Sequence, residues 1–269
     1  MRIPRPYAVL LALLATSAAP ASAQFSVPEP LAPGEDYRVE IGAAFWSPTP
    51  TLIIGGDEFD VLGQEVNFVQ EFGIEKDRFT EFRVTLKPGR KHKLRVHYIP
   101  FQYDQEATIQ RQFVFGGQVF NVGVEATADV GWKLWRVGYE WDFISRQNGF
   151  LGLIAELKHN TVEAEIDSPV GRALVDSRAP VPAVGVIGRG YMSENFSVTA
   201  EFTGFKMLDS FSEEFEAEFW DFDVYATLNF GRNAGVQGGY RSIDVEYLSE
   251  EDLGELTMKG WYFGGVVRF

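Results

Sequence analysis

The sequence contains no cysteine and only three histidines among its 269 residues. Without cysteine, neither a disulfide framework nor a thiolate metal site can form. No apolar run reaches the roughly 20 residues that a membrane-spanning helix needs. Basic residues are also few, 24 against 38 acidic ones, for a formal net charge of −14. Because nucleic-acid binding requires a basic face, we do not expect nucleic acid as a partner.

The first residues have the pattern of an export signal. Arg2 and Arg5 precede an apolar stretch, residues 8–15, that is too short to cross a bilayer, and Ala21-Ser22-Ala23 forms a small-x-small cleavage site. This pattern predicts a signal peptide over residues 1–23, cleaved after Ala23. The three prolines of residues 24–35 predict an extended periplasmic lead-in, and residues 36–269 then form the folded domain.

After the lead-in, apolar and polar residues alternate with period two, which indicates β-strands rather than helices. The clearest run is Asp221 to Phe230, where every second residue is apolar. About ten segments have membrane-spanning length, and the number falls to eight if two weaker segments are loops. Val181 to Tyr191 is weak because both of its faces are apolar. Ala234 to Tyr247 changes phase near Arg241, which predicts a bulge.

The connections between these segments alternate in length, as expected of a barrel with short periplasmic turns and long external loops. Gly116-Gly117 predicts the tip of a hairpin in the second long connection. The first long connection either plugs the barrel or remains outside it. The short turns are 88–90, 145–148, 192–195 and 231–233, and the long connections are 47–77, 104–126, 167–179, 208–216 and 249–256.

The last strand ends on Phe269, and Trp261, Phe263, Val267 and Phe269 share one of its faces. A terminal aromatic residue on such a strand resembles the assembly signal of Gram-negative outer-membrane β-barrels. The chain as a whole resembles the small barrels of that superfamily, which includes the outer-membrane proteins A and W. The resemblance implies an all-β, antiparallel up-and-down barrel in the outer membrane, inserted by the barrel-assembly machinery. It transfers no functional residue.

In a membrane-spanning barrel the apolar faces contact lipid, so the charged faces of the strands point into the lumen. The expected luminal charges are equal in number, eight basic and eight acidic, which favours an ion-pair network in a narrow interior over a selective pore. They are Arg38, Arg83, Arg95, Arg136, Lys158, Arg189, Arg241 and Arg268, with Glu40, Glu81, Glu140, Asp142, Glu156, Glu201, Asp221 and Asp223.

Three functions remain open at this point. The favoured one is a structural or surface role, in which acidic external loops meet lipopolysaccharide, other outer-membrane lipid or divalent cations. The second is a small-solute porin. The third is a lipid-modifying enzyme, because His159 and Thr161 share a face and resemble the His-x-Ser pair of outer-membrane lipid A deacylases. Thr replaces Ser in that pair, so we predict no catalytic residue, and we also expect no cofactor and no metal centre.

Overall fold

The computed structural model describes residues 31–56, 66–207, 215–249 and 252–269, all of which belong to the unit Leu31–Phe269. Strands dominate these residues, and none of their helices has the length and apolarity to cross a membrane. The predicted signal peptide and the first residues of the lead-in lie outside the described residues. The predicted lead-in is not extended throughout, because Pro33–Glu35 forms a short 3-10 helix.

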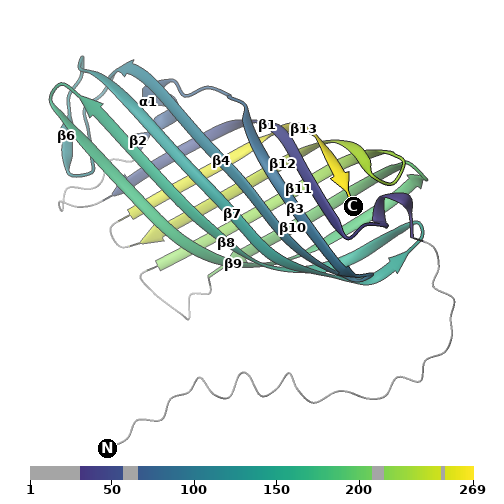
Figure 1. The fold of residues 1–269 in the computed structure, drawn as a ribbon. Coiled ribbons are helices and arrows are strands. Elements are labelled where there is room, and N and C mark those ends of the chain that lie inside the picture. Colours follow the sequence, from purple (N-terminus) through teal and green to yellow (C-terminus); the bar gives the residue numbers. More distant parts are fainter. Residues whose placement is uncertain (1–30, 57–65, 208–214, 250–251) are drawn as a thin grey trace, which may run out of the picture. The chain divides into compact units, whose positions relative to one another are not determined.

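Ten antiparallel strands follow one another round a barrel, and β13 pairs with β1 to close it (Figure 1). The all-β barrel and the ten-strand count predicted from the sequence are therefore confirmed. The barrel strands are β1 (Val39–Gly56), β3 (Phe79–Gly89), β4 (His92–Thr108), β7 (Glu125–Arg146), β8 (Gly149–Ser168), β9 (Gly171–Ser193), β10 (Phe196–Lys206), β11 (Phe215–Phe230), β12 (Ala234–Ser249) and β13 (Asp252–Arg268).

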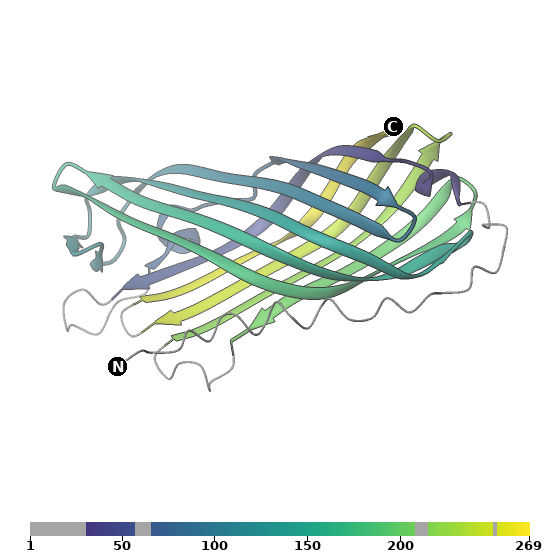
Figure 2. The same cartoon turned by 60° about the horizontal axis from the view of Figure 1, so that its bottom comes forward.

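The two ends of the barrel differ. One end, here the short-turn end, carries four tight turns together with Phe269 and the 3-10 helix. The opposite end, here the long-loop end, is extended by β7, β8 and β9, which have 22, 20 and 23 residues (Figure 2). The predicted long connection at residues 167–179 is wrong, since β8 and β9 stay paired up to Ser168 and Gly171.

Small elements fill the long-loop end. β2 (Val66–Asn67) pairs with β1, and α1 (Phe68–Phe72) follows it, starting at an Asn67 cap and ending at Gly73 with φ 66°. β5 (Phe113–Phe115) and β6 (Gln118–Phe120) form the predicted hairpin with its tip at Gly116-Gly117. Since α1 buries Phe68 and Phe72, part of the first long connection does fold inward.

Side chains alternate between outward and interior positions as the period of two predicts. The predicted bulge near Arg241 is wrong, because β12 keeps an unbroken register with both β11 and β13. Exposed apolar side chains form a belt nearer the short-turn end. Representative members are Phe45, Phe82, Val96, Val137, Trp141, Leu151, Leu153, Leu157, Val186, Val198, Phe222, Leu228, Phe263 and Val267.

The interior is polar toward the short-turn end, but its long-loop half is apolar, which the sequence reading did not predict. Phe101 stacks on Trp132 with ring centroids 4.9 Å apart and meets Trp46 edge-on at 5.4 Å. Phe68 of α1 meets Phe115 of the hairpin at 5.4 Å. Rings contributed by α1 and the hairpin need apolar partners on the wall, and the inward residues of that half of the wall supply them.

Adjacent glycines on β13 allow a matched test of barrel closure. A Cβ on Gly264 would lie 2.3 Å from the Ala43 carbonyl oxygen on β1, whereas a Cβ on Gly265 would lie 3.5 Å from the Gly235 carbonyl oxygen. We expect Gly264→Ala to destabilise the barrel by about 1–3 kcal/mol because the β1–β13 contact must open. The urea midpoint, followed by heat-modifiable gel mobility, measures this. Gly265→Ala is the control, and equal midpoints for the two variants would contradict the argument.

Candidate functional site in the barrel interior

A bridge of charges crosses the middle of the lumen, centred on Arg136 of β7. Its guanidinium lies 2.6 Å from Glu201 of β10, 3.0 Å from Glu156 of β8 and 2.9 Å from Asp221 of β11. All four side chains are buried. Lys158 adds a second cation, 3.3 Å from Asp221 and 3.4 Å from Glu156. One buried arginine therefore ties four different strands together across the interior.

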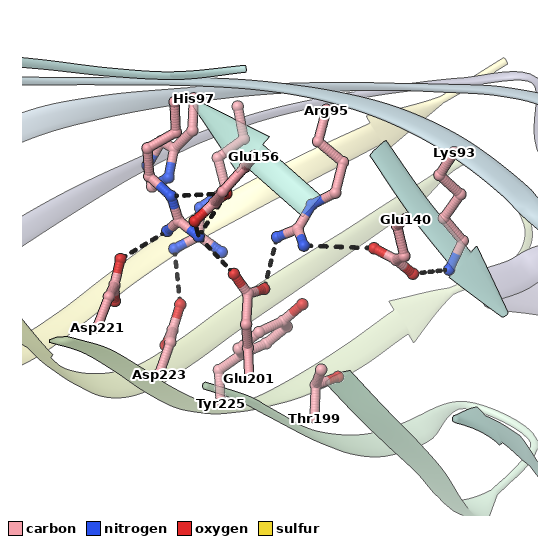
Figure 3. Close-up of polar contacts among 12 residues, drawn as sticks. Lys93, Arg95, His97, Glu140, Glu156, Thr199, Glu201, Asp221, Asp223 and Tyr225 are labelled. Carbon is pink, nitrogen blue, oxygen red and sulfur yellow. Dashed lines mark hydrogen bonds and ion pairs between the residues drawn. The ribbon is translucent and has the colours of Figure 1, made fainter. Parts of the chain in front are cut away.

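Arg95 extends this bridge toward the short-turn end (Figure 3). It lies between Glu201, at 2.5 Å, and Glu140, at 3.4 Å. Lys93 then contacts Glu140 at 2.6 Å and Asp142 at 3.0 Å. Lys93 and Arg95 are successive inward positions of β4, and Glu140 is paired with Lys93 on the neighbouring strand β7. Positive and negative side chains therefore alternate along this side of the lumen.

A second group adjoins the bridge, since Arg241 lies 3.7 Å from Asp221. Arg241 of β12 contacts Glu81 of β3 at 2.7 Å and Asp223 of β11 at 2.5 Å. Arg83 contacts the same two carboxylates at 2.9 and 3.1 Å. His97 lies 3.2 Å from Glu81, which therefore has three cationic or hydrogen-bonding neighbours. Paired in this way, the charges avoid the large penalty of an isolated buried ion.

Glu35, in the 3-10 helix before β1, enters the lumen from the short-turn end. Its carboxylate lies 3.0 Å from Lys87, 2.7 Å from Arg189 and 3.8 Å from Lys93. Burial alone would raise the pKa of this carboxyl, but the three cations together hold the pKa below its usual value. Gly34 lets the helix approach, since a Cβ there would lie 2.6 Å from the Tyr191 hydroxyl.

The structure brings together most of the luminal charges predicted from the sequence. Arg268 and Glu40 form a separate pair, 2.6 Å apart. Arg189 belongs to the Glu35 group rather than to the central bridge. Arg38 is the exception, because it is exposed at the rim and donates to the Pro88 carbonyl instead of entering the lumen.

Several interior residues were absent from the predicted set. Lys87 and Lys93 are buried and lie at inward positions next to outward Leu86 and Leu94, so the alternation itself could have identified them. No alternation in the sequence indicated that Glu35 lies in the interior. It precedes the first strand, and its place in the lumen depends on a local helical turn that the proline-rich lead-in did not predict.

The charged half of the interior is nearly full. The cavity among Tyr37, Glu40, Arg83, Arg95 and their neighbours has a volume of about 40 Å³. That space holds only a few water molecules, since one water needs at least roughly 10–15 Å³. Toward the long-loop end, the rings of the apolar half lie above this charged network.

The candidate enzyme residues lie elsewhere. His159 is exposed on the outward face of β8, and Thr161 follows on the same face. Among the described residues, no hydrogen bond joins them, and Glu163 instead lies 3.9 Å from Lys133. Those residues likewise contain no group of three or more His, Asp or Glu side chains arranged to hold a metal ion.

No protein-family model and no curated protein matches the sequence. Among solved structures, the outer membrane protease OmpT from Escherichia coli is 10% identical, with 86% of this chain and 97% of that chain covered and a TM-score of 0.55. Ail, the attachment invasion locus protein of Yersinia pestis, is 10% identical over 86% and 99%, with a TM-score of 0.38. Neisserial surface protein A is 12% identical over 86% and 97%, also at 0.38.

The chain has the fold of the Gram-negative outer-membrane β-barrels. At 10% identity the likeness to OmpT concerns the path of the backbone and not the side chains that act in that protease. Function must therefore be argued from this barrel's own residues.

The central bridge predicts that a single substitution within it greatly reduces the stability of the barrel. Glu201→Gln removes the charge between Arg95 and Arg136 and leaves two buried guanidiniums without that anion. We expect a loss of about 3–5 kcal/mol in unfolding free energy. Glu165→Gln removes the same charge from an exposed pair with Arg172, 2.6 Å away, and should cost under about 1 kcal/mol. Urea unfolding in the same detergent compares them, and equal losses would show that the bridge is not stabilising.

The Glu35 contact predicts a dependence on pH. Because its folded pKa is depressed, Glu35 stabilises the fold fully above its unfolded pKa, about 4.5, and this stabilisation is lost as pH falls through the folded pKa. The stability difference between the native chain and Glu35→Gln should therefore shrink from pH 7 to pH 3. Asp36→Asn, in an exposed pair with Arg232, is the control. A difference that is the same at both pH values would contradict this assignment.

Proposed function

We propose that this protein is an outer-membrane barrel with a closed lumen, which acts through the surface that it presents outside the cell. The observation that carries the proposal is the filled interior. An ion-pair network occupies one half and packed aromatic rings the other, so the barrel is built to be stable and not to conduct.

A reversal of polarity along the strands supports the membrane location. On β8, outward Leu151, Leu153 and Leu157 are exposed and apolar, while inward Glu156 and Lys158 are charged. Past His159 the arrangement inverts: Glu163 and Glu165 point outward, whereas Ala164 and Ile166 are buried inside.

The same reversal occurs on β7, where outward Val137 and Trp135 give way to Lys133 and Asp129. The first pattern suits a wall between hydrocarbon and a polar lumen. The second suits a wall between water and an apolar core. We therefore place the boundary of the membrane near His159, with the short-turn end in the periplasm.

The surface beyond that boundary is acidic. Asp104 is paired in register with Asp129, and Asp129 with Glu165. Partial burial, followed by the nearby Asp104 and Glu165 carboxylates, raises the pKa of Asp129. This like-charged face supports a surface role toward cationic partners, and it is where contact with lipopolysaccharide through bridging divalent cations would occur. Many acidic residues of the predicted loops lie outside the described residues.

The last strand supports assembly by the barrel-assembly machinery. Trp261, Phe263, Val267 and Phe269 all point outward, with Phe269 70% exposed. They lie on β13, which closes the barrel against β1. We infer that this outward aromatic row is the assembly signal, available until the last strand pairs.

Single-channel recording tests the closed lumen against the porin alternative. The refolded mature protein should produce no steady openings in a planar bilayer, because no continuous water-filled path crosses the interior. A wide porin in the same bilayers controls for the recording, and heat-modifiable mobility shows that the barrel is folded. Steady openings whose size or ion selectivity changes in Glu201→Gln or Arg136→Gln would establish conduction through the lumen and overturn the proposal.

A further inference from the structure

Among the residues that the structure describes, β9 has a free edge beside β10 near the long-loop end. β9 stays paired with β8 along its whole length, up to Ser168 and Gly171. On its other side it pairs with β10 only as far as Gly204 and Val184. Residues 171–183 of β9 therefore have no strand partner on that edge among the residues that the structure describes.

Two prolines fit this free edge. Pro180 and Pro182 lie two residues apart, so both direct their backbone nitrogens to the same edge of β9. Neither can donate a hydrogen bond, and proline within a sheet is confined to edges that need no donor. β9 keeps its register with β8 at both prolines, which lie opposite His159 and Leu157. The proline nitrogens, which carry no hydrogen, therefore face the edge of β9 that has no strand partner. The two prolines therefore prevent another strand from pairing fully with this edge of β9.

A cavity of about 510 Å³ lies at this free edge. On one side it is lined by Ala179, Pro180 and Val181 of β9, and on the other by Phe205 and Phe219. Phe219 is buried, and the Lys158 ammonium lies 3.9 Å from its ring centroid, so the charged network lies directly behind this ring. Val245 of β12 and Leu256 of β13 also line the cavity, so it extends into the apolar half of the barrel interior.

Two groups at the cavity can donate hydrogen bonds. Asn160 is buried, and its Oδ1 accepts a bond from Trp132 Nε1 at 3.0 Å. Its Nδ2 has no partner within the described part of the chain, and Asn160 lines the cavity. Arg178, also on the lining, is exposed and lies 3.8 Å from Asp176. On the opposite rim, the Glu218 charge is compensated by Lys206.

The cavity lies at the level of the proposed membrane boundary. Val184, in the last β9–β10 pair, and Phe202, two residues before Gly204 on β10, are exposed outward, and Val184 is 70% exposed. Pro180 is opposite His159, where the polarity of the wall reverses. The opening thus faces the upper edge of the outer leaflet, where an amphiphile keeps its head in water and its chain in hydrocarbon.

We propose that this cavity binds one long-chain fatty acid, whose chain enters sideways from the outer leaflet. The chain contacts the apolar walls, and the carboxylate accepts from Asn160 Nδ2. The inference rests on the proposed membrane orientation, but it does not depend on what the acidic surface contacts. The volume suits a single chain, since small-molecule sites typically span about 300–1,000 Å³.

Native mass spectrometry of the detergent-solubilised barrel with added palmitate tests the proposal. We expect a one-to-one adduct, weakened at least tenfold in Ala179→Trp, which fills the cavity. Ala155→Trp is the matched control, because Ala155 is exposed on the lipid-facing side of the neighbouring strand. An adduct unaffected by Ala179→Trp, or one formed only with a phospholipid, would overturn the assignment.

Asn160→Asp tests the recognition of the head group separately. Aspartate can still accept from Trp132, but it replaces the free donor by an anion that repels a carboxylate. Palmitate binding at neutral pH should fall at least tenfold, with heat-modifiable mobility retained, and unchanged binding would contradict the proposed contact. Loss of palmitate binding in a silent barrel refutes only this inference, whereas a conducting barrel that binds palmitate refutes only the closed lumen.

Discussion

The cost of burying charge inside a narrow barrel is the constraint on which the rest of this structure depends. Hydrocarbon outside requires apolar residues on every second position, so the remaining positions face an interior with little room for water. Each charge there needs a partner within about 3 Å, and Arg136 has three such carboxylates on three other strands. The need for pairing therefore links distant strands and closes the lumen at the same time.

The same constraint explains why the interior changes character along its length. Beyond the proposed membrane boundary the outer face of the wall meets water, so Glu163 and Glu165 are stable there without buried partners. The inward positions are then free to be apolar, and Trp132 and Ile166 join a core like that of a soluble β-protein. α1 and the β5–β6 hairpin complete that core, which covers the charged network from the long-loop side.

Alternation in the sequence was enough to predict the barrel, its ten strands and the inward direction of residues such as Glu201 and Arg241, because side-chain direction in a strand follows position alone. It could not predict which charges meet, since Arg95 and Glu201 lie on strands that are far apart round the wall. Nor could it predict where the wall inverts, because a period of two looks the same whichever face is apolar. The connection at residues 167–179 was misassigned for this reason: Asp167 was interpreted as the start of a loop, although it extends β8.

Because its strands differ in length, this closed barrel has a second region, besides its rim and loops, that can bind a ligand. A barrel whose strands all ended at the membrane would have a continuous wall and, with a filled lumen, only its rim and loops to offer. Here β9 continues 13 residues beyond its pairing with β10, and Pro180 and Pro182 keep that edge from accepting another strand. The lumen can stay closed because access to the apolar interior is lateral and does not require a path through the ion pairs. The ion pairs that stabilise the barrel and the cavity that binds a ligand therefore lie at different heights along the strands. The ring of Phe219, which packs over Lys158, lies between them.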